Sequence, residues 1–358
     1  VLDQANYSFG GTVVQGVAPV DGANRNLVWE TTETLNFGLD MGFLGNQYTL
    51  SIEGYRKLTY DILMKLPVST LYGLNAPYQN AGKVKNTGFE MTAGYKLNTH
   101  GWNFQVSANA AYNKNEVLDL KNGGARIWSG KYFNQEGYAI NSIGGYIAEG
   151  LFKTEEEVAN SATIPGTETA PGDIKYRDIN NDGKIDGEDR VYIGNTMPKW
   201  TFGLNLFAEW KGFDATFLFQ GAADVQGYLA GPGVVGEMIG AKGKPSYMYR
   251  DCWDAETNPN GKFPRAFSSY RQNNSIYNPS SFWIVNSSYL RLKNFQLGYT
   301  LPKEWCNVMG ISRIRVYYSG QNLLTFTKFD KGFDPESPEG GSSYPQVKTN
   351  TFGLNITF

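Results

Sequence analysis

The sequence predicts an all-β protein, a transmembrane antiparallel β-barrel with long extracellular loops. Several segments alternate apolar and polar residues over about 9–12 residues, the length of a tilted strand that crosses the hydrocarbon core. No run of about 18 apolar residues exists, so no apolar transmembrane helix is expected. Short turns alternate with long polar connections, as in outer-membrane barrels. A large soluble β-sandwich would also alternate, but its connections would lack this systematic change in length.

Nine segments carry the period of two that a strand with one apolar face requires. In the final stretch, TNTFGLNITF, Phe352, Leu354, Ile356 and Phe358 share one parity, and the polar residues share the other. The nine segments are 35–43, 48–57, 89–97, 102–113, 200–210, 213–221, 289–301, 313–326 and 349–358. Within 289–301 the apolar phase changes, which predicts a β-bulge near Lys293 and Asn294.

The connections predict which side of the membrane each end of a strand reaches. The short turns 44–46, 98–101 and 211–212, with an intermediate one at 302–311, are expected at the periplasmic side. The long polar connections are expected outside, at about 61–84, 117–198, 223–286 and 327–345. Charged residues on the polar parity would cost roughly 2–4 kcal/mol each at the bilayer midplane if they faced lipid. They are therefore expected to face a wet lumen, and they include Asp40, Glu90, Glu209, Asp214, Arg313 and Arg315.

The composition argues against several classes of function for this chain. Of the 358 residues, 15% are aromatic and 18% are charged, and the net charge of −2 gives no support for nucleic-acid binding. One His and two Cys exclude a His/Cys zinc cluster and a His-based catalytic triad. Cys252 and Cys306 are expected at opposite ends of the barrel, too far apart for a disulfide. The loop carboxylates have no fixed scaffold or matched spacing, so the chain is not expected to be an enzyme.

The stretch DINNDGKIDGED resembles a twelve-residue calcium loop. Oxygen ligands at its positions one, three, five, seven, nine and twelve would wrap one ion, and Gly183 occupies position six, where a sharp turn is needed. The predicted ligands are Asp178, Asn180, Asp182, the carbonyl of Lys184, Asp186 and Asp189. The twelfth position is Asp where Glu is usual, and Glu188 could substitute for it. The alternative is an acidic Asn/Gly turn without an ion.

Substrate contacts are expected in the connection 223–286, which is rich in Tyr, Trp, Arg and Asn. Aromatic rings stack on sugars, and Asn and Arg bond hydroxyl groups, but the same composition suits peptides, loop packing or contact with a lid protein. The candidate contacts are Tyr247, Tyr249, Trp253, Tyr270 and Arg271. A further set is expected to line the lumen and to fill it, namely Arg291, Arg313, Arg315 and Tyr317.

The chain also resembles a known family over nearly its whole length and in the same order. Stretches such as PGDIKYRDINNDGKIDGEDRVYIGNTMPKW, YLRLKNFQLGYTLP and RVYYSGQNLLTFTKFDKGFDPES are similar to the second half of SusC-like TonB-dependent transporters. The resemblance implies a multi-pass protein of the outer membrane whose 358 residues form the C-terminal portion of a 22-stranded barrel, its last nine strands. It also implies an N-terminal plug domain, which these residues do not include, contact with the TonB complex through that missing part, and a SusD-like surface lipoprotein.

The function that the resemblance implies is TonB-dependent import of oligosaccharides or oligopeptides. Its expected partners are the SusD-like lipoprotein, the TonB complex, the oligomeric substrate and outer-membrane lipid, with calcium as a structural cofactor. Two other classes remain at this point. One is a non-transporting outer-membrane adhesin or secretion barrel, and the other is a soluble calcium-stapled glycan-binding β module.

Overall fold

The computed structural model describes residues 2–229, 250–266, 277–308, 310–329, 333–337, 344 and 346–358. Among these residues no helix is long and apolar enough to cross a membrane. The elements of the first half are β1 Leu2–Phe9, β2 Thr12–Pro19, β3 Thr31–Phe43, β4 Tyr48–Lys65, η1 Thr70–Tyr72, β5 Tyr78–Thr99, β6 Trp102–Asp119, β7 Ile127–Ser129, β8 Tyr132–Asn134, β9 Ser142–Gly145, β10 Ala148–Leu151, α1 Glu155–Ala159 and β11 Ile174–Tyr176. Those of the second half are η2 Gly187–Asp189, β12 Val191–Gly194, β13 Trp200–Trp210, β14 Phe213–Ala223, β15 Gln226–Tyr228, η4 Ser281–Trp283, β16 Ile284–Asn286, β17 Tyr289–Thr300, α4 Lys303–Val308, β18 Arg313–Thr327 and β19 Thr349–Thr357.

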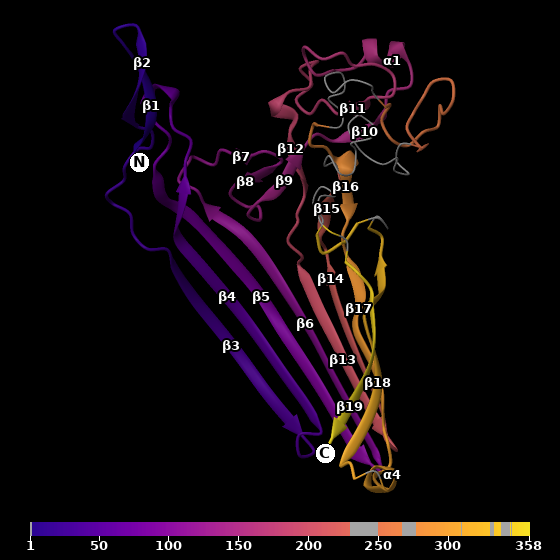
Figure 1. Ribbon diagram of the computed structural model, residues 1–358. Coiled ribbons are helices and arrows are strands. Elements are labelled where there is room, and N and C mark those ends of the chain that lie inside the picture. Colours follow the sequence, from indigo (N-terminus) through magenta and orange to yellow (C-terminus); the bar gives the residue numbers. More distant parts are fainter. Residues whose placement is uncertain are drawn as a thin grey trace. The chain divides into compact units, whose positions relative to one another are not determined.

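Nine long strands form one sheet in the order β19-β18-β17-β14-β13-β6-β5-β4-β3. They are the nine strands that the alternation predicts, and each pairs with its neighbour along the chain among the long strands. The printed pairings from β6 to β19 are all antiparallel. Figure 1 shows β13, β14, β17, β18 and β19 side by side, with the short turns at the end that carries α4. The sheet is the meandering wall of an antiparallel barrel, and it is not closed within these residues.

The chain divides into two compact units, and strands β3 to β6 contribute to both. The first unit contains 1–37, 54–88 and 113–141, and the second contains 38–53, 89–112 and 142–358. The first unit includes the hairpin β1–β2 and a small apolar cluster around Val84, Val117 and Leu120. The second unit includes strands β13 to β19 and the small strand pairs β9–β12, β10–β11 and β15–β16 of the long connections.

The bulge predicted in β17 is confirmed. The pairing of β17 shifts between Leu292 and Asn294 against β18, and the shift against β14 falls at the same level. The extra residue, Lys293, changes the face on which the following side chains lie. Leu292 pairs with Phe219 on the apolar face and Arg291 with Gln220 on the polar face, so both parts of β17 keep their apolar side chains on one side.

Aromatic side chains mark both ends of the apolar face. At the short-turn end, Trp102 stacks on Trp210 with ring centroids 5.1 Å apart. At the other end, Trp200 lies 5.5 Å from Phe89 and 5.0 Å from Tyr112. Trp200 and Trp210 are ten residues apart on β13, about 34 Å along the strand. With a tilt near 40° this span covers about 25 Å, the height of the apolar band between the aromatic girdles of an outer-membrane barrel.

A buried charge network ties the connection after β18 to the inner face of the sheet. Arg291 is 2% exposed, and its Nη2 lies 2.7 Å from Asp334 Oδ1 while its Nη1 lies 3.1 Å from Glu336 Oε1. Its Nε donates to Thr325 Oγ1 at 3.1 Å. The guanidinium thus neutralises two carboxylates of the stretch 333–337 and holds it against β17 and β18.

The structure also departs from the expected connections. Strands β4 and β5 extend to Lys65 and from Tyr78, so much of the predicted loop 61–84 is strand. The hairpin β1–β2 was not among the predicted strands. The connection 117–198 has structure of its own, including α1, whose Thr154 side chain accepts the Glu157 N–H at the N-terminus. Cys252 and Cys306 are free and buried.

Replacing Arg291 is expected to be far more damaging than replacing its neighbour. In Arg291→Met of the full-length protein, two carboxylates lose their main partner, so the free energy of unfolding should fall by about 3–5 kcal/mol. Lys293→Met is the matched control: Lys293 Nζ lies 3.5 Å from Glu336 Oε2 with its side chain 33% exposed, so the loss should stay below about 1 kcal/mol. Urea unfolding in detergent micelles, followed by tryptophan fluorescence, measures both. Equal losses in the two variants would contradict the assigned role of Arg291.

Candidate functional site: the polar inner face and the outer loops

The inner face of the second unit carries a group of polar side chains near the short-turn end. Arg315 of β18 makes a two-pronged ion pair with Asp214 of β14, and its Nε donates to Asp214 Oδ1 at 2.9 Å. Arg315 Nη2 also lies 3.2 Å from Gln296 Oε1. The pairing register places these three residues on the face opposite the apolar one. The prediction that Asp214 and Arg315 face away from lipid therefore agrees with the strand pairing.

Gly298 makes room for that ion pair. A Cβ atom at Gly298 would meet the guanidinium of Arg315 at its Cζ and Nε, both 2.7 Å away. Gly353 does the same for the ring of Tyr317 on the adjacent strand pair. Because neither glycine has a side chain, the large polar groups can lie flat across the wall. The inner surface stays polar without filling the space in front of it.

Nearer the end with the long connections, the inner face forms a concavity, here called the upper inner pocket. Its lining combines side-chain amide, hydroxyl and carboxylate groups with apolar surface, a mixture that suits an uncharged polar ligand. The turn at Pro335 and Glu336, held by Arg291, forms part of its wall. The other residues used below are Asn109, Thr201, Gly203, Leu218, Gln220 and Tyr289.

An ion pair with a buried carboxylate joins the two longest connections, 117–198 and 223–286. Arg265 Nε donates to Asp173 Oδ1 at 3.0 Å and Nη2 donates to Asp173 Oδ2 at 3.1 Å. Asp173 is 4% exposed, and burial raises the pKa of its carboxyl although the Arg265 guanidinium acts in the opposite direction. The Arg265 N–H also donates to the Gly172 carbonyl at 2.9 Å. These contacts fix residues 250–266 on the connection that follows β10.

Of the five candidate substrate contacts, the structure describes only Trp253. Its side chain is 7% exposed and packs over Gly172, where a Cβ would lie 2.4 Å from the ring. Lys153 Nζ lies 5.9 Å from the ring centroid. Trp253 thus packs between the two longest connections, and its contact with substrate stays a prediction. Tyr247, Tyr249, Tyr270 and Arg271 lie outside the described residues.

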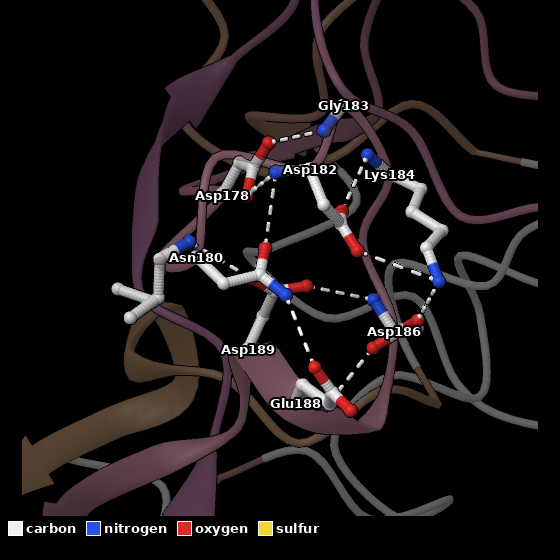
Figure 2. Close-up of polar contacts among 9 residues, drawn as sticks. Asp178, Asn180, Asp182, Gly183, Lys184, Asp186, Glu188 and Asp189 are labelled. Atoms are coloured by element: carbon white, nitrogen blue, oxygen red, sulfur yellow. Dashed lines mark hydrogen bonds and ion pairs between the residues drawn. The ribbon is translucent and has the colours of Figure 1, made fainter.

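The acidic stretch 178–189 folds as a compact turn whose carboxylates accept backbone N–H groups (Figure 2). Asp178 accepts from Asp182 at 3.3 Å and from Gly183 at 2.8 Å. Asp189 is fully buried and accepts from Ile179 and Asp186, both at 2.8 Å. Other polar contacts complete the turn, namely Asp182 N–H to Asn180 Oδ1 at 3.2 Å and Glu188 N–H to Asp186 Oδ1 at 2.9 Å.

Lys184 supplies the positive charge nearest to this turn. Its Nζ lies 2.7 Å from Asp186 Oδ2 and 3.4 Å from Asp182 Oδ2. The hydrogen bond with Asp186 raises the pKa of Lys184, and the same bond lowers the pKa of Asp186. In the part of the chain that the structure describes, no three His, Cys, Asp or Glu side chains are placed so that they could hold a metal ion.

Sequence reasoning missed the upper inner pocket. Asn109 and Gln220 lie on the polar parity of predicted strands, so their place on the inner face could be expected. Glu336 could not be assigned, because nothing in the local sequence shows that the connection after β18 turns back onto the wall. The partners Asp173 and Arg265 are 92 residues apart and were missed for the same reason.

Comparison with known proteins places the chain in a family. Residues 2–323 match the family model described as TonB dependent receptor-like, beta-barrel. The TonB-dependent receptor P3 of Formosa agariphila is 31% identical over 373 residues, which cover 98% of this chain and 36% of that protein. The TonB-dependent receptor SusC of Bacteroides thetaiotaomicron is 28% identical over 388 residues, 99% of this chain and 34% of SusC.

The solved structure of the RagAB peptide transporter agrees with the chain along its full length. The TM-score is 0.77 at 26% identity, covering 100% of this chain and 38% of that one. The chain spans little more than a third of the length of the relatives that it matches. An antiparallel wall with an apolar face between two aromatic belts is what an outer-membrane location requires. This chain belongs to the SusC-like TonB-dependent receptors of the outer membrane, and it is part of their β-barrel.

Proposed function

We propose that the protein imports an oligomeric nutrient, an oligosaccharide or an oligopeptide, across the outer membrane. The observation that carries the proposal is the likeness to SusC and to the RagAB peptide transporter along almost the whole chain. The polar inner face supports it, because Gly298 and Gly353 let Arg315 and Tyr317 lie flat beside the passage. Membership of an outer-membrane barrel family leaves no support for the soluble glycan-binding module.

Energy and capture would come from partners. The outer membrane has no nucleotide supply, so we propose that transport is driven through the TonB complex, acting on a plug domain of the full-length protein. A SusD-like lipoprotein would cover the outer connections and retain the ligand. In this scheme the substrate passes the upper inner pocket, where Asn109, Thr201 and Gln220 can bond hydroxyl or amide groups and Leu218 and Tyr289 contact its apolar parts.

We also propose that the turn 178–189 binds one calcium ion in the outer connection. The support is the ligand spacing, together with five carboxylates in a turn of twelve residues whose one Lys, Lys184, contacts two of them, Asp182 and Asp186. Calcium would be held by Asp178, Asn180, Asp182, the Lys184 carbonyl, Asp186 and Asp189, and it would staple the turn. Binding would require the ammonium of Lys184 to leave Asp182 and Asp186.

Deletion of the full-length gene is expected to abolish growth on one complex glycan or peptide source. Restoring it with Asn109→Leu and Gln220→Leu should raise the concentration that supports half-maximal uptake, because two hydrogen-bonding groups are lost from the pocket. Asn103→Leu, on the inner face outside this pocket, is the matched control. Uptake should also stop in a strain that lacks TonB. Unimpaired growth of the deletion strain on every oligomeric nutrient would favour an adhesin or a secretion barrel instead.

The orientation of the barrel is testable by labelling whole cells. A cysteine at Glu156 of α1 should react with an impermeant maleimide, because the long connections are proposed to be extracellular. A cysteine at Asn98, in β5 beside the short turn to β6, should react only after the outer membrane is permeabilised. The native Cys252 and Cys306 are buried, so background labelling should be low. Reaction of the Asn98→Cys variant alone on intact cells would reverse the proposed orientation.

Calcium binding is measured by titrating the chelator-treated full-length protein in a calorimeter. Wild type should bind one ion with a dissociation constant of about 10⁻⁴–10⁻³ M, as extracellular modules do. Asp178→Asn with Asp182→Asn should abolish binding, whereas Lys184→Gln should strengthen it because no ammonium has to be displaced. Asp254→Asn, in a turn outside 178–189, is the control. If wild type binds no calcium and Lys184→Gln binds none either, the stretch is an acidic turn that Lys184 neutralises.

A further inference from the structure

Four basic side chains lie on the outward face of the first unit. They are called the outward basic patch and comprise Arg56 of β4, Lys83 and Lys85 of β5, and Lys114 of β6. We propose that this patch binds the phosphate groups of lipid A, the phosphorylated glycolipid of the outer leaflet. The proposal is independent of what the barrel transports, since it rests on the outer-membrane location and on the proposed extracellular side of the long connections.

The patch is assigned to the outward face because the residues next to it in sequence lie on the inner face of the same strands. Tyr55 Oη donates to Asn113 Oδ1 at 3.2 Å, and Asn113 Nδ2 donates to Asn86 Oδ1 at 3.3 Å. Asn113 has the parity of Asn103 in β6, and Asn103 bonds Glu209 on the inner face. Successive side chains of a strand point to opposite faces. The neighbours of Tyr55, Asn86 and Asn113, which include Arg56, Lys85 and Lys114, therefore point outward.

The level of the patch follows from the pattern along β5 and β6. The outward parity is basic at Lys83 and Lys85 and becomes aromatic at Phe89, four residues further along β5. In β6 it is aromatic at Tyr112 and basic at Lys114. Four residues of strand span about 13 Å. Cations are costly in hydrocarbon but not at its interface, so the patch lies at the level of the lipid head groups.

The charge balance of the patch favours an anionic ligand. Glu116 is the acidic side chain that contacts it, with Oε2 3.1 Å from Lys85 Nζ and 3.3 Å from Lys114 Nζ. One carboxylate thus holds two ammonium groups together and neutralises one of them. The Lys114 side chain is 58% exposed, and Arg56 is also exposed. With four cations and one anion the patch has a net charge of about +3, which attracts phosphates at an anionic membrane surface.

Lipid A is the ligand that this position selects. An outward patch at head-group level meets membrane lipid, and the extracellular side of the outer membrane presents a glycolipid that carries phosphate on a sugar backbone. Ammonium groups held by Glu116 can contact phosphate, while the exposed Arg56 and the half-buried Lys83 reach neighbouring phosphates or sugar hydroxyls. The occupant is therefore a lipid and not a soluble substrate of the barrel.

The test compares lipid retention by the delipidated full-length protein in nanodiscs. The probes are monophosphoryl lipid A, the same lipid without phosphate, and phosphatidylglycerol. The variant is Lys85→Gln with Lys114→Gln, and the control is Lys57→Gln with Lys121→Gln, two cations of the same unit outside the patch. Native mass spectrometry measures the bound lipid, and the heat-modifiable mobility of each variant shows that the barrel is folded.

Wild type and control should retain monophosphoryl lipid A, and the patch variant should bind it about thirtyfold more weakly, since each basic side chain near an anionic surface contributes about fivefold. Glu116→Gln should bind it more tightly than wild type. Three results would each overturn the proposal: equal retention by wild type and the patch variant, equal retention of the dephosphorylated lipid, or equal binding of phosphatidylglycerol. If the patch variant fails to assemble, the Glu116→Gln variant still decides, because unchanged affinity in it would also contradict the assignment.

Discussion

Every backbone N–H and C=O group that lies in hydrocarbon must be bonded to a neighbouring strand, because no water can replace the bond. This constraint makes the sheet continuous from β3 to β19. The strands therefore share one backbone pattern and differ in their side chains. Because those side chains alternate, one strand has to satisfy lipid on one face and water on the other. The aromatic belts, the Asp214–Arg315 pair and the outward cations are each placed by that single alternation.

The position of a charged side chain therefore depends on the face of the sheet that it occupies and on its level along the strand. On the inner face Arg315 is matched by Asp214, and Arg291 by Asp334 and Glu336, so large cations lie against the wall without an excess of charge. On the outer face, cations gather where the apolar parity of β5 and β6 ends. The long connections also pair their charges, since the buried Asp173 is held by Arg265.

The strands and the bulge could be predicted from the sequence because a period of two is a local signal, and the phase change after Leu292 is visible within one segment. The predicted strands are shorter than β4 and β5, which extend to Lys65 and from Tyr78. The extensions were missed because the apolar and polar residues no longer alternate there. The burial of Trp253 and the contacts of Arg291 depend on residues distant in sequence, which leave no periodic trace. The acidic turn shows the same limit, since ligand spacing is local but the position of Lys184 between Asp182 and Asp186 is not.

The bulge at Lys293 shows which changes in length β17 can accept. Lys293 is the residue that the bulge adds, so its deletion would leave Leu292 and Asn294 on their present faces. A regularly paired insertion of one residue between Gln296 and Leu297 would instead rotate every side chain on one side of the insertion to the opposite face. If the part of β17 before that insertion rotated, Arg291 would point into the acyl chains, and Leu290 and Leu292 into the lumen. An insertion in a long connection lengthens a solvated segment at little cost, whereas a one-residue insertion between the regularly paired residues of β17 reverses part of the strand. During divergence of the family, length variation should therefore accumulate in the connections and be purged from this strand.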